Sequence, residues 1–572
     1  MNNRKTLLIA SFLTLVAAGA GFATRGAAGP AWAKMGIGQG DFGAIMGYGF
    51  LGFGFFIFFG GIFVEKFGYK KLMIGTVVLH LISAVMLVLA PGMYESWVDS
   101  VGQVEATAKV VLLLKLSVLL FSVCNGLYEA AINPLVGQLY PENQTHYLNI
   151  LHAGWPGGMI IGGLLAAAFQ NETAWIAEIP WQYALASYSV VLIILMLTIV
   201  KQDFPPTVSA SGKSSFPVLF SCFLSIPFII LIVLHGLIGY MELGVDSWTT
   251  RLMENLIENS VTILIYTSIL MFVLRFFAGP IVHKLNPIGL LALSSVIAVF
   301  GLLWLSQEIT SVFVIFAAAT LYSLGKAFLW PTMLAVAGER YPQSGAIAMC
   351  ALGAAGMISV GFLGGPMIGA QQSEAMTVSL KADSSETFLR YEDGEASTWG
   401  YSYGKLSPAL SQAAMEYSKA HTAIKEADTA RVIDAEATGK HNKLKTDSLA
   451  AIDKQKKRYS TEDSRDLTAE ERTLLKDNIS TDGKSIIKAF DTGSRRALFL
   501  TALLPVGMSI GFIGLFVYYR SIGGYSVISL DDAGSATDSP PSEASGGAAD
   551  DAGEPASEGE IADGGGDEPT AD

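Results

Sequence analysis

The stretch GGIFVEKFGYKKLM, from Gly60 to Met73, places four charged side chains between two long apolar runs. The runs cover residues 42–64 and 70–91. Each contains the roughly 20 apolar residues that a helix needs to cross about 30 Å of hydrocarbon. Charges confined between two such runs predict a short loop on one face of a membrane. The stretch therefore indicates a membrane protein whose second and third spanning helices are joined here.

The composition of the whole chain agrees with a membrane protein. Of its 572 residues, 51% are hydrophobic and only 15% are charged, which is too apolar for an ordinary soluble domain. The first apolar run follows two basic residues and is interpreted as a retained helix rather than a cleaved signal. Twelve runs are predicted to span the membrane, near residues 6–26, 42–64, 70–91, 108–138, 148–169, 182–201, 218–244, 259–283, 287–306, 310–336, 344–369 and 496–520.

The distribution of basic residues predicts the orientation of these spans. The short connections at 92–107 and 170–181 carry acidic residues but no Lys or Arg. Basic residues in short loops mark the cytoplasmic side of a membrane. We therefore expect a multi-pass protein of the cell membrane with both termini in the cytoplasm. The residues then expected on the inner face are Lys66, Lys70, Lys71, Lys201, Lys213, Lys284, Arg340 and Arg520.

Two polar regions interrupt this pattern. Residues 371–495 are long and polar, and by parity they form an extracytoplasmic insertion between spans 11 and 12. Within it, residues 407–437 favour a helical hairpin or a partly disordered region. Residues 531–572 contain thirteen acidic residues and no basic one, which accounts for the net charge of −13 and favours disorder. The predicted units are a bundle at 1–201, a cytoplasmic linker at 202–217, spans 7–11 at 218–370, the insertion, span 12 at 496–522 and a disordered acidic cytoplasmic tail at 523–572.

The two halves of the chain repeat the same landmarks. The stretch GPIVHKLNPIGLL, from Gly279 to Leu291, holds the place in the second half that GGIFVEKFGYKKLM holds in the first. The stretches NPLVGQLYP (133–141) and GGMIIGG (157–163) are echoed by WPTMLAVAGERYP (330–342) and AGMISVGFLGG (355–365). Such a repeat predicts two related six-helix bundles that move about a central site.

The charged loop resembles the signature between helices 2 and 3 of the major facilitator superfamily, with Glu65 in place of Asp and Tyr69 in place of Arg. The resemblance implies an all-α membrane protein with twelve helices in two pseudo-symmetric six-helix bundles. It also implies a cytoplasmic gate that latches the bundles, formed by Gly61, Glu65, Lys66, Gly68, Lys70, Lys71, Arg275, Gly279 and Lys284. The stretches at 133–149, 239–248 and 275–291 are similar to the fucose/hexose permease branch, which implies a sugar as solute.

Ionisable side chains within the spans are functional candidates because their insertion is costly. They are Arg25, Glu129, His152, His235, Glu242, Asp246 and Lys326. Asn133 should share a helix face with Glu129, and Tyr240 and Trp330 are candidates for stacking on a sugar ring. Structural interpretations remain open: Arg25 can reach the membrane surface, Asp246 is expected in solvent at the outer end of span 7, and either glutamate can pair with Arg25 or Lys326.

These residues favour secondary transport of a small polar solute, most simply a sugar or sugar derivative, with protons or sodium as coupling ions. Arg25 and Lys326 together would suit an organic anion instead. A third hypothesis is a membrane receptor or scaffold that acts through the insertion. No phosphate-binding loop, His-Glu-x-x-His motif or metal-ligand spacing occurs in the chain, so we expect no enzyme, cofactor or metal site. The expected partners are the lipid bilayer, the solute and the coupling ion, with no nucleic acid and a monomeric state.

Overall fold

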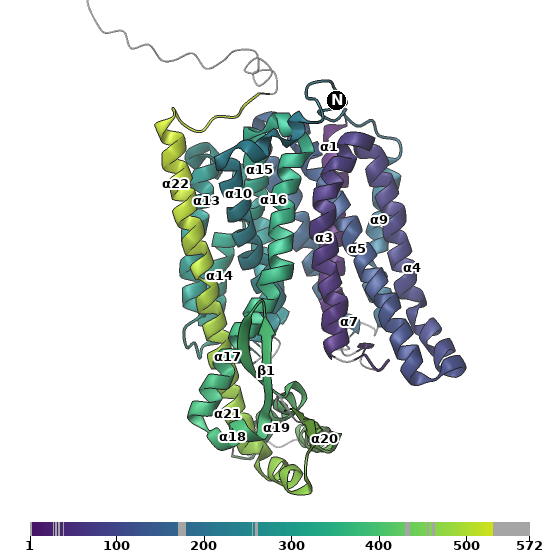
Figure 1. Ribbon diagram of the computed structural model, residues 1–572, viewed down its shortest axis with the longest axis vertical. Coiled ribbons are helices and arrows are strands. Elements are labelled where there is room, and N and C mark those ends of the chain that lie inside the picture. The colour runs from purple at the N-terminus through teal and green to yellow at the C-terminus, as the bar shows by residue number, and fades with distance from the viewer. Residues whose placement is uncertain are drawn as a thin grey trace, which may run out of the picture.

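Long apolar helices run side by side through the molecule and form two groups (Figure 1). The computed structural model describes residues 3–26, 28, 31–32, 35–37, 39–169, 179–253, 255–257, 261–429, 435–454, 457–459 and 464–529. Among these residues, eleven helical stretches are long and apolar enough to cross a membrane, and the shorter apolar helix α12 makes twelve. The twelve-span fold expected from the sequence is confirmed.

The first group is called the N-half. Its elements are α1 (Arg4–Gly26), α3 (Gln39–Phe67), α4 (Tyr69–Val101), α5 (Gln103–Leu139), the 3₁₀ turn η1 (Pro141–Asn143), α6 (Gln144–His152), α7 (Gly154–Phe169), α8 (Trp181–Ala186) and α9 (Tyr188–Ile199). Glycines allow close helix approach: a Cβ added to Gly158 on α7 would clash with the carbonyl oxygen of Val16 on α1. The small residues of the apolar runs thus hold the N-half together.

The second group is called the C-half. Its elements are η2 (Val218–Leu224), α10 (Ile226–Gly239), η3 (Tyr240–Gly244), α11 (Val245–Leu252), α12 (Val261–Arg275), α13 (Ala278–Leu305), α14 (Val312–Lys326), α15 (Leu329–Arg340), η4 (Pro342–Ser344), α16 (Gly345–Ser359), η5 (Val360–Gly364), α17 (Gly365–Asp383) and α22 (Leu503–Ser521). Two of these, η3 and η5, are π-helical turns inside spans 7 and 11. The two spans cross closely, because a Cβ added to Gly239 would clash with the carbonyl oxygen of Gly356.

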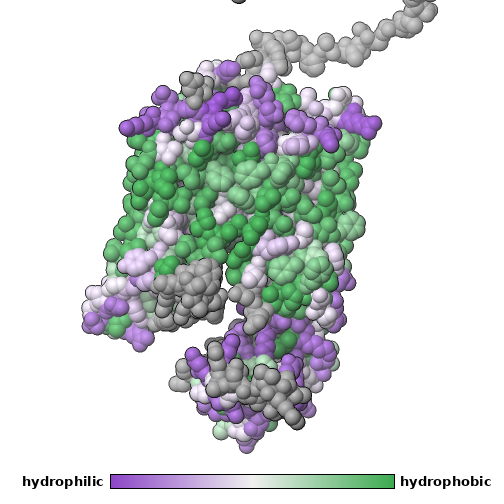
Figure 2. All heavy atoms as spheres, turned by 180° about the vertical axis from the view of Figure 1, so that it is seen from behind, coloured by the Kyte–Doolittle hydropathy of each residue, from purple (hydrophilic) through white to green (hydrophobic). Residues whose placement is uncertain are grey.

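The surface of the two halves matches a lipid environment. Figure 2 shows an apolar band across the middle of one face of the bundle and polar side chains toward both ends. Large apolar side chains such as Ile82, Leu197, Phe300 and Ile510 are exposed within the spans. Because such side chains occur on spans of both halves, lipid rather than a second protein layer would cover them.

The connection at 92–107 differs from the short loop that the sequence predicted. Helices α4 and α5 continue through it, with 33 and 37 residues, and turn at the single residue Gly102, whose φ is 85°. Only glycine adopts this left-handed conformation without strain. Polar residues on the protruding ends, including the pair Glu105 and Lys109 at 3.1 Å, keep these helical turns compatible with water.

The insertion between spans 11 and 12 is folded. Its elements are α18 (Ser385–Tyr391), β1 (Glu392–Thr398), β2 (Tyr401–Leu406), α19 (Pro408–Thr429), α20 (Ala435–Lys454), β3 (Lys457–Tyr459), β4 (Ser464–Asp466) and α21 (Ala469–Thr501), and the end of α17 also enters it. The two short antiparallel hairpins, β1–β2 and β3–β4, were not predicted from the sequence. A separate apolar core that includes Leu380, Tyr391, Leu475 and Phe490 supports the fold.

An ion pair between a half-buried arginine and a buried carboxylate fixes α18 on α21 inside the insertion. Arg390 donates from Nε to Asp482 Oδ2 at 2.8 Å and from Nη2 to Oδ1 at 2.5 Å, and Thr387 donates to the same carboxylate at 2.9 Å. At the tip of the β1–β2 hairpin, Trp399 Nε1 donates to the carbonyl oxygen of Phe362 in η5 at 2.5 Å. The insertion is therefore tied to the bundle by two continuous helices and by this hairpin.

The chain after α22 does not leave the bundle at once. Tyr525 donates to Glu339 Oε2 at 2.6 Å, the amide of Ile528 donates to the Glu339 carbonyl at 2.9 Å, and Arg340 donates to the Ser526 carbonyl at 2.6 Å. We call residues 525–528 the C-terminal strap. The sequence placed them in a disordered tail, whereas the structure packs them on α15. Residues 530–572 lie outside the described residues.

Candidate functional site

Four charged side chains meet in the middle of the C-half. Glu242 lies on η3, Asp246 on α11, Arg275 on α12 and Lys326 on α14, and all four are buried. Arg275 Nη2 donates to Glu242 Oε1 at 3.1 Å, and Lys326 donates to Asp246 Oδ1. Each of these two cations of the C-half thus has its own carboxylate, which offsets the cost of burying the charge in a low-dielectric interior.

The position of Asp246 corrects the sequence-based expectation of a solvated residue. It lies four residues after Glu242, so that an ordinary helix would place both carboxylates on one face. That spacing is a signal that the sequence analysis could have used. The π turn between the two residues changes the helical register here, and the carboxylates pair with different cations.

Arg275 also differs from its predicted place in the cytoplasmic gate. Besides Glu242, it donates from Nη1 to the His152 carbonyl at 2.6 Å and from Nε to the Ala327 carbonyl at 2.8 Å. His152 belongs to the N-half and Ala327 to the C-half. One buried guanidinium therefore bonds across the interface between the halves, at the centre of the protein rather than at its end.

On the N-half side, three side chains form a hydrogen-bonded chain. The Asn133 amide nitrogen lies 3.4 Å from Glu129 Oε2, and the Asn133 amide oxygen lies 3.0 Å from His152 Nε2. Because the carboxylate accepts from Asn133, the amide oxygen is left to accept from His152. The order Glu129, Asn133, His152 thus connects two titratable groups, and the face shared by Glu129 and Asn133 that the sequence predicted is present.

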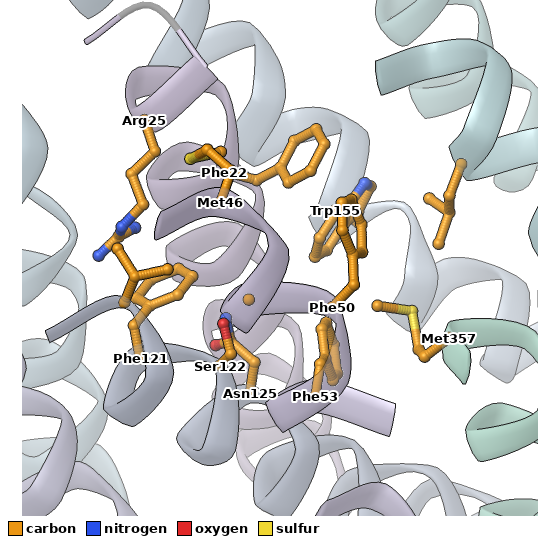
Figure 3. Close-up of a pocket in the computed structure, with 13 residues that line it drawn as sticks. Phe22, Arg25, Met46, Phe50, Phe53, Phe121, Ser122, Asn125, Trp155 and Met357 are labelled. Carbon is orange, nitrogen blue, oxygen red and sulfur yellow. The ribbon is translucent and has the colours of Figure 1, made fainter. Parts of the chain in front are cut away.

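A cavity of about 330 Å³ lies between these groups. It is lined from both halves by Phe53, Glu129, His152, Trp155, Glu242, Leu243, Arg275, Trp330 and Met357. A second cavity of about 480 Å³ shares Phe53, Trp155, Leu243 and Met357 with the first and reaches Arg25 (Figure 3). Together the two cavities offer carboxylates, a histidine and aromatic faces, which suits a small polar solute.

The remaining predicted site residues occupy different places. Trp330 lines the smaller cavity, and the His235 ring packs edge-on against it at 4.5 Å between ring centroids. Tyr240 is half-buried where spans 7 and 11 cross, and Lys326 is buried against Asp246. Among the described residues, Tyr240 and Lys326 line neither of these two cavities. Asn125 and Ser122, which the sequence analysis missed, line the larger one.

The predicted gate residue Glu65 bridges the halves at the end of the bundle that carries the termini. Its Oε1 accepts from the Ala346 amide at 3.0 Å, and its Oε2 accepts from the Ser209 amide at 3.1 Å and the Ser209 hydroxyl at 2.8 Å. Ala346 lies in the first turn of α16, so the carboxylate also faces the positive end of a helix dipole. One helical turn before Glu65, a glycine is needed at position 61, because a Cβ added there would lie 2.9 Å from Cys350 Sγ.

Of the other predicted gate residues, some contact neighbouring segments and others are exposed at the surface. Lys70 Nζ donates to the carbonyl of Gln202 in the linker at 2.8 Å, and the Gly279 amide donates to His146 Nδ1 across the interface at 3.2 Å. Gly68 has φ 82° and separates α3 from α4. Lys66, Lys71 and Lys284 are exposed.

A second carboxylate bridges the halves at the same end. Thr145 at the start of α6 donates to Glu339 Oε1 at 2.8 Å, while the C-terminal strap donates to Oε2 of the same side chain. Asn149 also donates to Thr332 Oγ1 at 3.2 Å. The halves are thus held together at the end of the bundle that carries the termini, and the structure represents a state closed at that end. Among the described residues, no three potential metal ligands gather.

Comparisons with known proteins agree with this architecture. A family model described as Major Facilitator Superfamily matches residues 7–366. The E. coli fucose:proton symporter FucP aligns with a TM-score of 0.50 and 17% identity over 64% of this chain and 91% of its own. The proton:xylose symporter XylE, bound to 6-bromo-6-deoxy-D-glucose, aligns with a TM-score of 0.54 and 14% identity over 63% and 87%. No curated protein matches the sequence.

Proposed function

The chain belongs to the major facilitator superfamily, and on that basis we propose that it is a secondary active transporter for a small polar solute, a sugar or sugar derivative. The observation that carries the proposal is the central cavity, lined from both halves and flanked by Glu129, Glu242 and Arg275. A site between two rocking halves is reached first from one side of the membrane and then from the other. Alternating access then moves the solute without any covalent chemistry.

The contacts at the terminal end fit the role of a gate in this cycle. Opening that end breaks the hydrogen bonds of Glu65 to α16 and the linker, and the bond from Thr145 to Glu339. Hydrogen bonds to charged groups contribute about 1.5–3 kcal/mol each, and water replaces part of that on opening. The gate therefore holds one state by a modest free energy, which solute binding can offset.

Reconstitution tests the proposed function directly. Purified protein in proteoliposomes should take up a radiolabelled sugar or sugar acid from a panel, and a proton gradient or a sodium gradient should drive its accumulation. Counterflow without any gradient should also occur with the same solute. If no solute in the panel crosses while the insertion binds a partner protein, the receptor or scaffold hypothesis replaces transport.

We further propose that both termini and the linker are cytoplasmic and that the insertion is extracytoplasmic, in a monomeric protein of the cell membrane. The exposed residues Ser211 and Lys443 mark the linker and the insertion. In a background without Cys124, Cys222 and Cys350, Lys443→Cys should react with a membrane-impermeant thiol reagent on intact cells. Ser211→Cys should react only after lysis. The reverse labelling pattern would invert the proposed orientation.

A further inference from the structure

Arg25 differs from the other two cations buried in the middle of the membrane-spanning bundle. Arg275 and Lys326 each pair with a carboxylate, whereas Arg25 forms no ion pair with any described residue. Its Nη1 donates to the Gly21 carbonyl at 2.8 Å, and its Nε and Nη2 have no hydrogen-bond partner among the described residues. Only 2% of the residue is exposed. The alternative that the Arg25 side chain simply reaches the membrane surface is therefore not what the structure shows.

Aromatic rings hold this guanidinium in place. Its carbon lies 3.5 Å from the Phe121 ring centroid and 5.2 Å from that of Tyr188. His80 packs against both rings, with centroids 4.8 Å and 4.7 Å away. Cation–π attraction offsets part of the cost of burial, but it leaves the N–H groups along the edge of the guanidinium, at Nε and Nη2, without acceptors. A buried cation with free donors is ready to receive an anion.

The guanidinium borders the larger cavity. Figure 3 shows Arg25 and Phe121 together on one side of it, with Trp155, Phe50 and Met357 on the opposite side. Asn125, which also lines the cavity, has its Oδ1 without a partner among the described residues. The cavity thus combines one unpaired positive charge, a polar amide and a largely apolar wall that includes several aromatic side chains.

We propose that Arg25 binds the anionic group of the transported solute, which is therefore a small organic monoanion such as a sugar acid. This inference rests on the proposed function and assigns the solute class at the same cavity. A carboxylate accepts two parallel hydrogen bonds from Nε and Nη2, a geometry that guanidinium matches well. The body of the solute packs on Trp155 and Phe50 and extends toward the adjoining cavity. There its hydroxyl groups donate to the free Oε2 of Glu242.

The charge balance argues for a monoanion. Within the described lining of both cavities, Arg275 is neutralised by Glu242, Arg25 lacks a carboxylate, and Glu129 lacks a cation. When Glu129 carries the coupling proton, Arg25 is the one uncompensated charge, and a single solute carboxylate cancels it. A dianionic phosphate ester would leave one negative charge uncompensated next to Glu129 and Glu242, which a low-dielectric cavity disfavours.

Matched probes test this assignment on the purified, full-length protein. We expect D-glucuronate, D-gluconate or benzoate to raise the midpoint of thermal unfolding, and the neutral counterparts D-glucose, D-sorbitol and benzyl alcohol to have much smaller effects. Arg25→Gln should weaken binding of the effective anion by about 10- to 100-fold, the loss expected for hydrogen bonds to a charged group. Arg25→Lys keeps the charge and should retain part of the affinity. Arg520→Gln, at an exposed position, should leave it unchanged.

Two outcomes would overturn the assignment: neutral probes that stabilise the wild-type protein as well as the anions do, or no stabilisation by any of the three anions. Neither depends on whether the Arg25 variants fold. Counterflow separates this inference from the proposed function. Transport of a neutral sugar that is insensitive to Arg25→Gln would leave the transporter standing and remove the anion site. Anion binding that depends on Arg25, without counterflow of any solute, would support the anion site and remove the proposed transport function.

Discussion

Arg275→Met should abolish transport and lower the free energy of unfolding by about 3–5 kcal/mol, the cost of removing one partner of a buried ion pair. The substitution leaves the Glu242 carboxylate buried without its cation. It also removes the donors to the carbonyls of His152 and Ala327, one in each half. Thermal unfolding in detergent and counterflow in proteoliposomes measure the two effects.

The double variant Arg275→Met with Glu242→Leu separates stability from function. With no unpaired charge left, its thermal stability should return close to that of the wild type, because apolar side chains often replace a buried ion pair without loss. Its transport should remain absent, since the cross-interface bonds of Arg275 are still missing. Arg520→Met, at an exposed position, serves as the control. Wild-type stability of the single variant would show that the pair contributes little.

Glu129→Gln should eliminate accumulation of solute against a gradient while leaving counterflow intact. The change keeps the shape of the side chain and an acceptor for Asn133, but removes the group that can carry a proton. Glu129 is a better candidate for the proton carrier than Glu242. Arg275 bonds to Glu242, whereas Glu129 is connected through Asn133 to His152, a second titratable group. A gradient of one pH unit, about 1.4 kcal/mol, supports about tenfold accumulation when one proton accompanies each solute. The expected ratio for the variant is one.

The matched control for this experiment is Glu105→Gln, an exposed acidic residue at the protruding start of α5. Its accumulation ratio should equal that of the wild type. Persistent accumulation in Glu129→Gln would place the coupling proton elsewhere. Loss of both accumulation and counterflow, at normal expression, would instead make Glu129 a solute ligand.

The sequence predicted the spans well because their length and apolar character follow directly from the thickness of a bilayer. It predicted the helix contacts in the centre less well. In a chain whose spans are apolar on every side, periodicity does not tell which face meets which neighbour. Glu242 and Glu129 were therefore equivalent candidates in the sequence. The structure distinguishes them, because Glu242 pairs with Arg275 and Glu129 accepts a hydrogen bond from Asn133.

Local backbone features account for other differences. A π turn carries no clear sequence signal, so the separate pairing of Glu242 and Asp246 could not be anticipated. A single glycine at 102 was enough to replace a predicted loop by two helix ends. In the insertion, weak apolar spacing hid a small core, because its buried side chains, such as Tyr391 and Phe490, are spread over several elements.

The sum of the buried charges decides how the cycle responds to membrane voltage. Arg25, Arg275 and Lys326 balance Glu129, Glu242 and Asp246, so the empty centre is neutral when all six are ionised. A neutral sugar bound together with one proton would make the loaded centre positive, and a potential of 100 mV would then act on it with about 2.3 kcal/mol. A monoanion at Arg25 cancels that proton. If the solute is a monoanion and one proton accompanies it, as proposed above, transport is electroneutral and the pH difference alone drives it.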